Sequence, residues 1–201
     1  MGRLTITSAL LVTTALLCVG CSSSQPEEAA PAPVTTTART IAPEEDTMNS
    51  IADGNCLNPE DIDTSNPDAL SRGYVMMTYC WDSVHDRPLT AASIRAKELM
   101  TEEFAQRQVE PERNAAQGMF NQAYKHQAYS QPSVTLSPTE VNSQDTENSA
   151  TRVYLVEWDW IGRDGTTSTG GKAIASVGMV KEGDTWKVSG SATDGFVEER
   201  S

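Results

Sequence analysis

The 201-residue sequence has few of the residues that build reactive or metal-binding sites. It contains only two histidines, His85 and His126, and these stand alone without the spacing of metal ligands. The one Cys-x-x-Cys spacing, Cys18-Val19-Gly20-Cys21, ends the apolar N-terminal run, and none occurs beyond it. There is also no serine elbow, phosphate-binding glycine loop or zinc-binding helix motif. The sequence therefore predicts neither a metal nor a cofactor, and it gives no positive support for catalysis.

Basic residues are also scarce relative to acidic ones. The chain has 15 Lys and Arg against 28 Asp and Glu, a formal net charge of −13. Such a surface repels phosphate backbones and anionic lipid headgroups. We therefore expect no nucleic-acid partner and no adsorption on a membrane through charge.

Long apolar runs are missing except for one, from Leu4 to Gly20, which follows the single early charge of Arg3. A basic start followed by an apolar stretch and small residues is typical of a secretory signal. The run ends in Leu17-Cys18-Val19-Gly20-Cys21, which resembles a bacterial lipobox, although Cys18 stands where leucine is usual. We expect residues 1–20 to be a signal peptide and Cys21 to carry fatty acyl chains such as palmitate. A plain cleaved signal with an unmodified Cys21 is the alternative.

Residues 21–65 have the composition of a tether. Nine acidic residues and one basic residue, Arg39, lie between Ser22 and Ser65, among many prolines, serines and threonines. Segments with few apolar side chains and high charge do not bury enough surface to fold. We expect a disordered acidic spacer, with a receptor-binding motif as the alternative, between the lipid and a folded domain at residues 66–201.

The two cysteines beyond the lipobox, Cys56 and Cys80, favour a disulfide bond. Two thiols in an oxidising compartment are a natural pair, and the bond would close a loop of roughly 25 residues, worth about 3 kcal/mol. A metal site is the weaker alternative.

The first half of the domain has helical signals. Ser65-Asn66-Pro67-Asp68 combines a capping residue, a proline and an early acid, as at a helix start. Further helices are expected from Thr90, from Thr101, which would act as a cap, and over Glu112–Tyr129. The first helix places four large side chains along one stripe: Leu70, Tyr74, Met77 and Trp81.

After Pro132 the apolar residues repeat with a period of two, which is typical of strands. Strands are expected at Ser133–Val141, as an edge strand, and at Thr151–Ile161, Lys172–Lys181 and Thr185–Val188. Helices followed by a four-stranded antiparallel meander predict an α+β domain with helices packed on one face of a curved sheet. The face that bears Trp158 and Trp160 is expected to point inward, because its side chains are the larger; Glu157 and Asp159 then point outward.

Several short motifs resemble one known group of proteins. They are Tyr79-Cys80-Trp81-Asp82, Asp86, Pro88, Ala91-Ala92, Arg95-Ala96, Leu99-Met100-Thr101 and the hairpin Gly183-Asp184-Thr185-Trp186-Lys187-Val188. Over residues 66–197 the chain is similar to actinobacterial envelope lipoproteins with a nuclear-transport-factor-2-like cone domain. That group includes accessory proteins of lipid-import systems and subunits of conjugation machines. The resemblance implies a cone in which the sheet curves around a space beneath the helices.

Some side chains are candidates for chemistry or binding. Asp82, His85, Asp86, Glu157 and Asp159 are the candidates for acid–base work, although Asp82 and Asp86 more simply end a helix and shape a turn. His126 is expected at an exposed helix position. The aromatic residues expected to form core or to line a ligand pocket, with core favoured, are Tyr79, Trp81, Trp158 and Trp160.

These features predict a non-enzymatic lipoprotein anchored on the extracytoplasmic face of the cell membrane. Its expected role is that of an accessory subunit that binds another envelope protein, with Glu157 and Asp159 on the docking face. A carrier or sensor of a small apolar ligand held in the cone is the alternative, and an isomerase-like or cyclase-like enzyme is a third.

Overall fold

The computed structural model describes residues 56–137 and 145–198, with the side chain of residue 198 left out. The helices are α1 (Pro67–Thr78), α2 (Thr90–Arg95), α3 (Glu102–Gln106) and α4 (Gln117–Tyr124), with short 3-10 turns η2 (Pro59–Asp61) and η3 (Lys97–Leu99). The strands are β1 (Tyr129–Leu136), β2 (Ser149–Ile161), β3 (Thr167–Glu182) and β4 (Thr185–Glu198). The calls on residues 1–55, including the signal peptide, Cys21 and most of the tether, lie outside the described residues.

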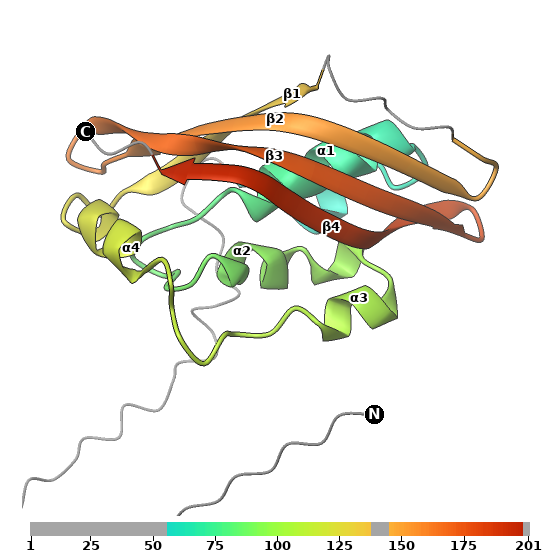
Figure 1. Cartoon of the computed structure of the whole chain (residues 1–201), viewed down its shortest axis with the longest axis horizontal. Coiled ribbons are helices and arrows are strands. Elements are labelled where there is room, and N and C mark those ends of the chain that lie inside the picture. Colours follow the sequence, from blue (N-terminus) through green and yellow to red (C-terminus); the bar gives the residue numbers. More distant parts are fainter. Residues whose placement is uncertain (1–55, 138–144, 199–201) are drawn as a thin grey trace, which may run out of the picture. The chain divides into compact units, whose positions relative to one another are not determined.

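The strands form one antiparallel sheet in the order β1-β2-β3-β4, and the four helices lie on one side of it (Figure 1). The pairing register shifts at one place between β2 and β3 and at two places between β3 and β4. Such irregularities bend a strand and increase its twist, which curves the sheet. The predicted α+β architecture with a four-stranded meander is therefore confirmed.

The start of α1 follows from its sequence. Asn66 is the cap, and its side-chain oxygen accepts hydrogen bonds from the backbone nitrogens of Asp68 (2.8 Å) and Ala69 (3.3 Å). Pro67 occupies the first helical position, where a missing N–H costs nothing. The residues of the predicted stripe are buried, with Leu70, Tyr74, Met77 and Trp81 all less than 4% exposed, but Trp81 lies beyond the end of the helix at Thr78. Thr101 caps α3 through the backbone nitrogen of Phe104, as predicted.

The disulfide between Cys56 and Cys80 is present, with the two Cα atoms 5.6 Å apart. It joins the first described residue to the segment that follows α1. Cys80 is fully buried, and Arg95 Nη2 donates to its carbonyl oxygen at 2.5 Å. The bond therefore fixes the beginning of the domain to its core.

Two boundary predictions were wrong. The helix expected over Glu112–Tyr129 is only α4, because the chain turns after Tyr124 and Gln127 adopts a positive φ of 47°. The first strand begins at Tyr129 rather than Ser133 and includes Pro132, which is tolerated because β1 is an edge strand.

The last two strands are longer than the sequence suggested. β3 begins at Thr167 and β4 runs to Glu198, ten residues past Val188. The added residues of β4 are mostly small or polar and lack alternation, so their strand conformation comes from pairing with β3.

Candidate functional site

The four aromatic residues that were expected to form core or to line a pocket pack together around Trp81. Its ring centroid is 5.6 Å from Tyr79, 5.6 Å from Trp158 and 6.4 Å from Trp160. Phe120 of α4 joins the cluster, 6.4 Å from Trp81 and 5.9 Å from Trp160. The rings therefore link the end of α1, strand β2 and α4 in one packed group, and the Trp face of β2 points inward as predicted.

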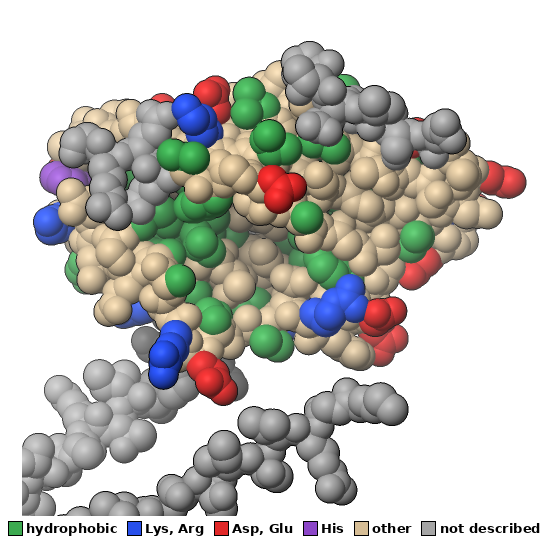
Figure 2. Space-filling view, in the orientation of Figure 1, with side chains coloured by type: hydrophobic (Ala, Val, Ile, Leu, Met, Phe, Trp, Pro, Cys, Tyr) green, Lys and Arg blue, Asp and Glu red, His purple; other side chains and the backbone are tan. Residues whose placement is uncertain are grey.

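Trp158 lies against a stretch of β3 that has no side chains. A Cβ atom on Gly170 would come within 2.2 Å of the Trp158 ring, and one on Gly171 within 2.6 Å. Phe196 of β4 also packs against Trp158, with ring centroids 5.1 Å apart, and remains 38% exposed. The indole nitrogen of Trp158 is buried and has no hydrogen-bond partner among the described residues. Figure 2 shows hydrophobic side chains around a hollow on this side of the molecule, between the sheet and the helices.

Asp82 and Asp86 do shape the turn after α1, as predicted. The backbone nitrogen of Asp82 donates to Asp86 Oδ2 at 2.8 Å, and that of Val84 donates to Asp82 Oδ1 at 3.0 Å. Both carboxylates are also fully buried, at 0% and 1% exposed, which the turn interpretation did not anticipate. Buried carboxylates need a compensating charge.

Two arginines that sequence reasoning missed supply that charge. Arg95 Nη1 lies 2.5 Å from Asp86 Oδ1, and Arg163 Nη2 lies 2.6 Å from Asp82 Oδ2. Burial raises the pKa of Asp86, and the adjacent guanidinium of Arg95 opposes that rise. Each acid is thus held in an ion pair, an arrangement that favours a structural role over proton transfer.

The two histidines lie on different segments of the chain. His126 is exposed as predicted, but it follows the end of α4 and pairs with Asp164 of the β2–β3 turn, Nδ1 to Oδ2 at 2.7 Å. The hydrogen bond from His126 lowers the pKa of Asp164. His85 lies in the turn after α1. Within residues 56–137 and 145–198, no three His, Cys, Asp or Glu side chains gather as metal ligands.

A polar cavity of about 450 Å³ adjoins the His126–Asp164 pair, lined by Tyr124, Lys125, His126, Gln127, Arg163 and Asp164. Arg163 connects the lining of this cavity to the buried Asp82, because its Nη1 donates both to Asp82 and to the carbonyl oxygen of Gln127. The backbone nitrogen of Arg163 donates to the carbonyl oxygen of His126 at 3.0 Å. These bonds fasten the end of α4 to the β2–β3 turn.

The outer face of the sheet carries the predicted docking residues. Glu157 and Asp159 are exposed. Beside them Leu155 of β2 lies opposite Ile174 of β3, and these side chains are 39% and 37% exposed. Asp194 of β4 is exposed opposite Ile174. The face therefore has an apolar centre with carboxylates around it.

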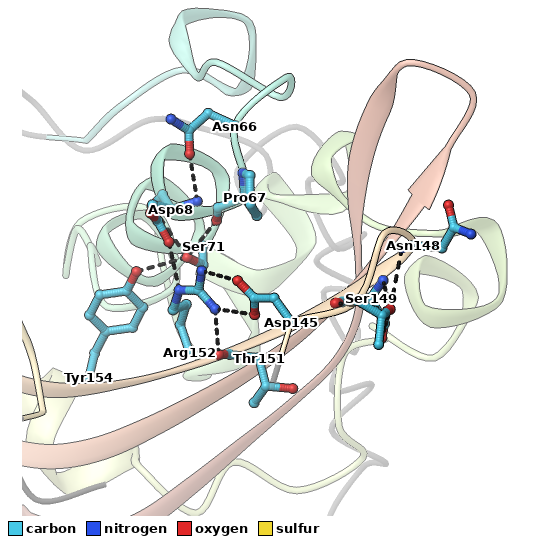
Figure 3. A network of polar contacts seen from close by, with 11 residues as sticks. Asn66, Pro67, Asp68, Ser71, Asp145, Asn148, Ser149, Thr151, Arg152 and Tyr154 are labelled. Carbon is cyan, nitrogen blue, oxygen red and sulfur yellow. Dashed lines mark hydrogen bonds and ion pairs between the residues drawn. The ribbon is translucent and has the colours of Figure 1, made fainter. Parts of the chain in front are cut away.

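A second network of polar contacts is centred on an arginine of β2 (Figure 3). It was not predicted from the sequence. Arg152 of β2 makes two 2.7 Å hydrogen bonds to Asp145 and one of 2.6 Å to Asp68 in the first turn of α1. Nearby, the hydroxyls of Tyr154 and Ser71 are 2.8 Å apart. These contacts attach α1 to β2.

The chain gives no match to family models, to curated proteins or to solved structures. Among the described residues, no helix is long and apolar enough to cross a membrane.

Proposed function

We propose that the chain is a non-enzymatic lipoprotein of the cell envelope, anchored through Cys21, that binds a protein partner with the outer face of its sheet. The domain would be a nuclear-transport-factor-2-like cone, held off the membrane by residues 21–55, since the disulfide of Cys56 and the backbone bond from Trp186 to Thr64 attach residues 56–65 to the domain. The lipobox-like sequence and the motifs named above support the anchoring and the family.

The observation that carries the binding role is the outer face itself. Leu155 and Ile174 form an exposed cross-strand apolar pair. Covering such a pair with an apolar surface of another protein would stabilise the complex. Glu157 and Asp159 follow Leu155 along β2, Asp194 lies opposite Ile174, and Lys172 lies opposite Glu157. A partner with basic residues around an apolar patch complements this surface, and the charge would speed and select its association.

The buried acids support the non-enzymatic part of the proposal. General acid–base catalysis needs a group that can exchange protons with a substrate. Asp82 and Asp86 instead have arginine partners and accept backbone hydrogen bonds in their own turn.

The test is a matched pair of charge reversals. Glu157→Lys with Asp159→Lys changes the net charge by the same amount as Glu110→Lys with Glu112→Lys, two exposed residues of the segment between α3 and α4. Partner capture from native membranes should fall at least tenfold for the first variant only, while both variants melt like the parent protein. Equal losses for both variants, or no loss for the first, would contradict the proposed docking face.

A second candidate function, a carrier of a small apolar ligand, is favoured by one observation. The Trp158 indole N–H is buried and has no hydrogen-bond partner in the described part of the chain, and the partly exposed Phe196 packs against its ring. An apolar ligand with one acceptor oxygen would satisfy that N–H if Phe196 moved aside. Titration with lauric acid should then change tryptophan fluorescence, and Phe196→Ala should alter the affinity; an unchanged spectrum contradicts this candidate.

A further inference from the structure

The two outer edges of the sheet differ in how far the domain closes them. On β1, Tyr129 bridges to Asp82, the backbone nitrogen of Ser130 donates to Trp81 at 2.8 Å, and Pro132 has no N–H to offer. Hydrogen bonds from a neighbouring segment and a proline in the strand both protect an edge strand against pairing with another chain. The β1 edge is thus blunted over its first half.

The first half of β4 is closed as well. Trp186 donates its backbone N–H to Thr64 at 2.7 Å, and Val188 accepts from the backbone of Thr101 at 2.9 Å. Met100 forms a parallel bridge with Val188. The chain itself therefore already uses this edge to add an extended segment.

The second half of β4, Ser191–Val197, has no such cover among the described residues. It pairs with β3 on one side, and its backbone has no other backbone partner within the described part of the chain. All seven residues are exposed, including Phe196 at 38% and Val197 at 46%. In Figure 1 this part of β4, drawn in red, forms the border of the sheet.

The sequence of this half-strand is not that of a protected edge. It contains no lysine and no proline, and its one charge is Asp194. Protected edges usually carry such residues or a β-bulge, because unpaired N–H and C=O groups otherwise recruit another strand. A bulge interrupts the pairing at Gly195 and Phe196, where Gly195 has a φ of 60°. The regularly paired run Ser191–Asp194 spans about 13 Å, enough for a few interstrand hydrogen bonds.

We propose that Ser191–Val197 is a strand-addition site, where an extended segment of the protein partner pairs as a fifth strand. The segment alternates basic and apolar residues. Its basic side chains meet Asp194 and the adjoining acidic face, and its apolar side chains, on the other face of the segment, cover Phe196. This inference rests on the proposed function, because the edge is continuous with the outer face through the Ile174–Asp194 pair.

The probe is a capped nine-residue peptide of alternating lysine and valine, with a glutamate–valine peptide of equal length as control. The folded domain should bind the lysine peptide at least tenfold more tightly. Two N-methylated forms of the lysine peptide, each blocked along one edge, separate backbone pairing from charge attraction. One form should lose binding at least tenfold and the other should retain it, because a strand pairs through one edge only. Amide exchange should slow within residues 191–197.

Two variants locate the site. Asp194→Lys should weaken binding of the lysine peptide, and Asp159→Lys, an equal charge change away from the edge, should weaken it less. The proposal is overturned by absence of binding, by equal binding of both N-methylated forms, or by protection outside β4. Dimers of the free protein with the same amides protected would assign the edge to a second copy instead. Any of these results leaves the charge-reversal test of the outer face to be decided separately.

Discussion

Asp82 and Arg163 are 81 positions apart in the sequence and form an ion pair, with 2.6 Å between Oδ2 and Nη2. The aspartate side chain is 1% exposed and the arginine 25%. The pair connects the turn after α1 to the turn between β2 and β3, so it links the helical layer to the sheet.

Removing one partner should be costly, because it leaves a buried charge without compensation. Arg163→Met is expected to lower the free energy of unfolding by about 3–5 kcal/mol. The double variant Asp82→Leu with Arg163→Met should recover part of that loss, since no buried charge remains. Urea denaturation measures both. A single variant within about 0.5 kcal/mol of the parent, as expected for an ordinary surface change, would contradict this role.

The pH dependence of stability should include a contribution from Asp145. Its hydrogen bonds from Arg152 lower its pKa below the ordinary 3.8. The unfolded chain therefore takes up this proton at a higher pH than the folded protein does. The stabilisation is fully present above about pH 4 and is lost as the pH falls through the lowered pKa of the folded state. Asp145→Asn should thus differ most from the parent at pH 7 and converge with it in acid, as followed by urea unfolding at several pH values. A difference that stays constant with pH would contradict this assignment.

Gly170 should be intolerant of a side chain, because the Trp158 ring occupies the space where a Cβ would lie. Gly170→Ala is expected to cost about 1–3 kcal/mol as overpacking. Gly118→Ala in α4 is the matched control, since nothing lies within 4 Å of its Cβ position, and helix propensity favours alanine there. A Cβ at Gly170 would also lie 2.7 Å from the backbone carbonyl oxygen of Trp158, and that contact remains in a Trp158→Leu background. The Gly170→Ala penalty should therefore shrink in that background without vanishing; a penalty of the same size would assign it to the carbonyl contact rather than to the ring.

Membrane attachment should depend on Cys21 alone among the first cysteines. Cys21→Ser is expected to release the protein into the soluble fraction, because the acyl chains have no other attachment point. Cys18→Leu, which brings the lipobox to its usual form, should leave the protein in the membrane fraction. Fractionation with a salt wash and immunoblotting distinguishes these outcomes. A Cys21→Ser protein that stays with the membranes would remove the basis for the anchor.

Local signals in the sequence predicted much of the fold. The Asn66-Pro67 start of α1, the Cys56–Cys80 bond and the inward Trp158 follow from capping, cysteine pairing and period-two alternation. The extent of β4 did not, because its second half becomes a strand only through pairing with β3. The arginine partners of Asp82 and Asp86 were also missed: contacts 81 and 9 positions apart leave no periodic mark. Of the candidate site, the exposure of Glu157 and Asp159 was predictable from alternation, whereas the placement of Asp194 opposite Ile174 on the same sheet required the strand order.

The most direct test of the docking role is site-specific photo-crosslinking in native membranes. A crosslinking amino acid at Leu155 reports on the outer face, and the same group at Val109, which is 62% exposed on the segment between α3 and α4, reports on another surface. We expect one dominant adduct from position 155 and none of comparable yield from position 109. Salt should weaken the adduct from position 155, and Glu157→Lys with Asp159→Lys should abolish it. The same adducts from both positions, or none from position 155, would contradict the docking role.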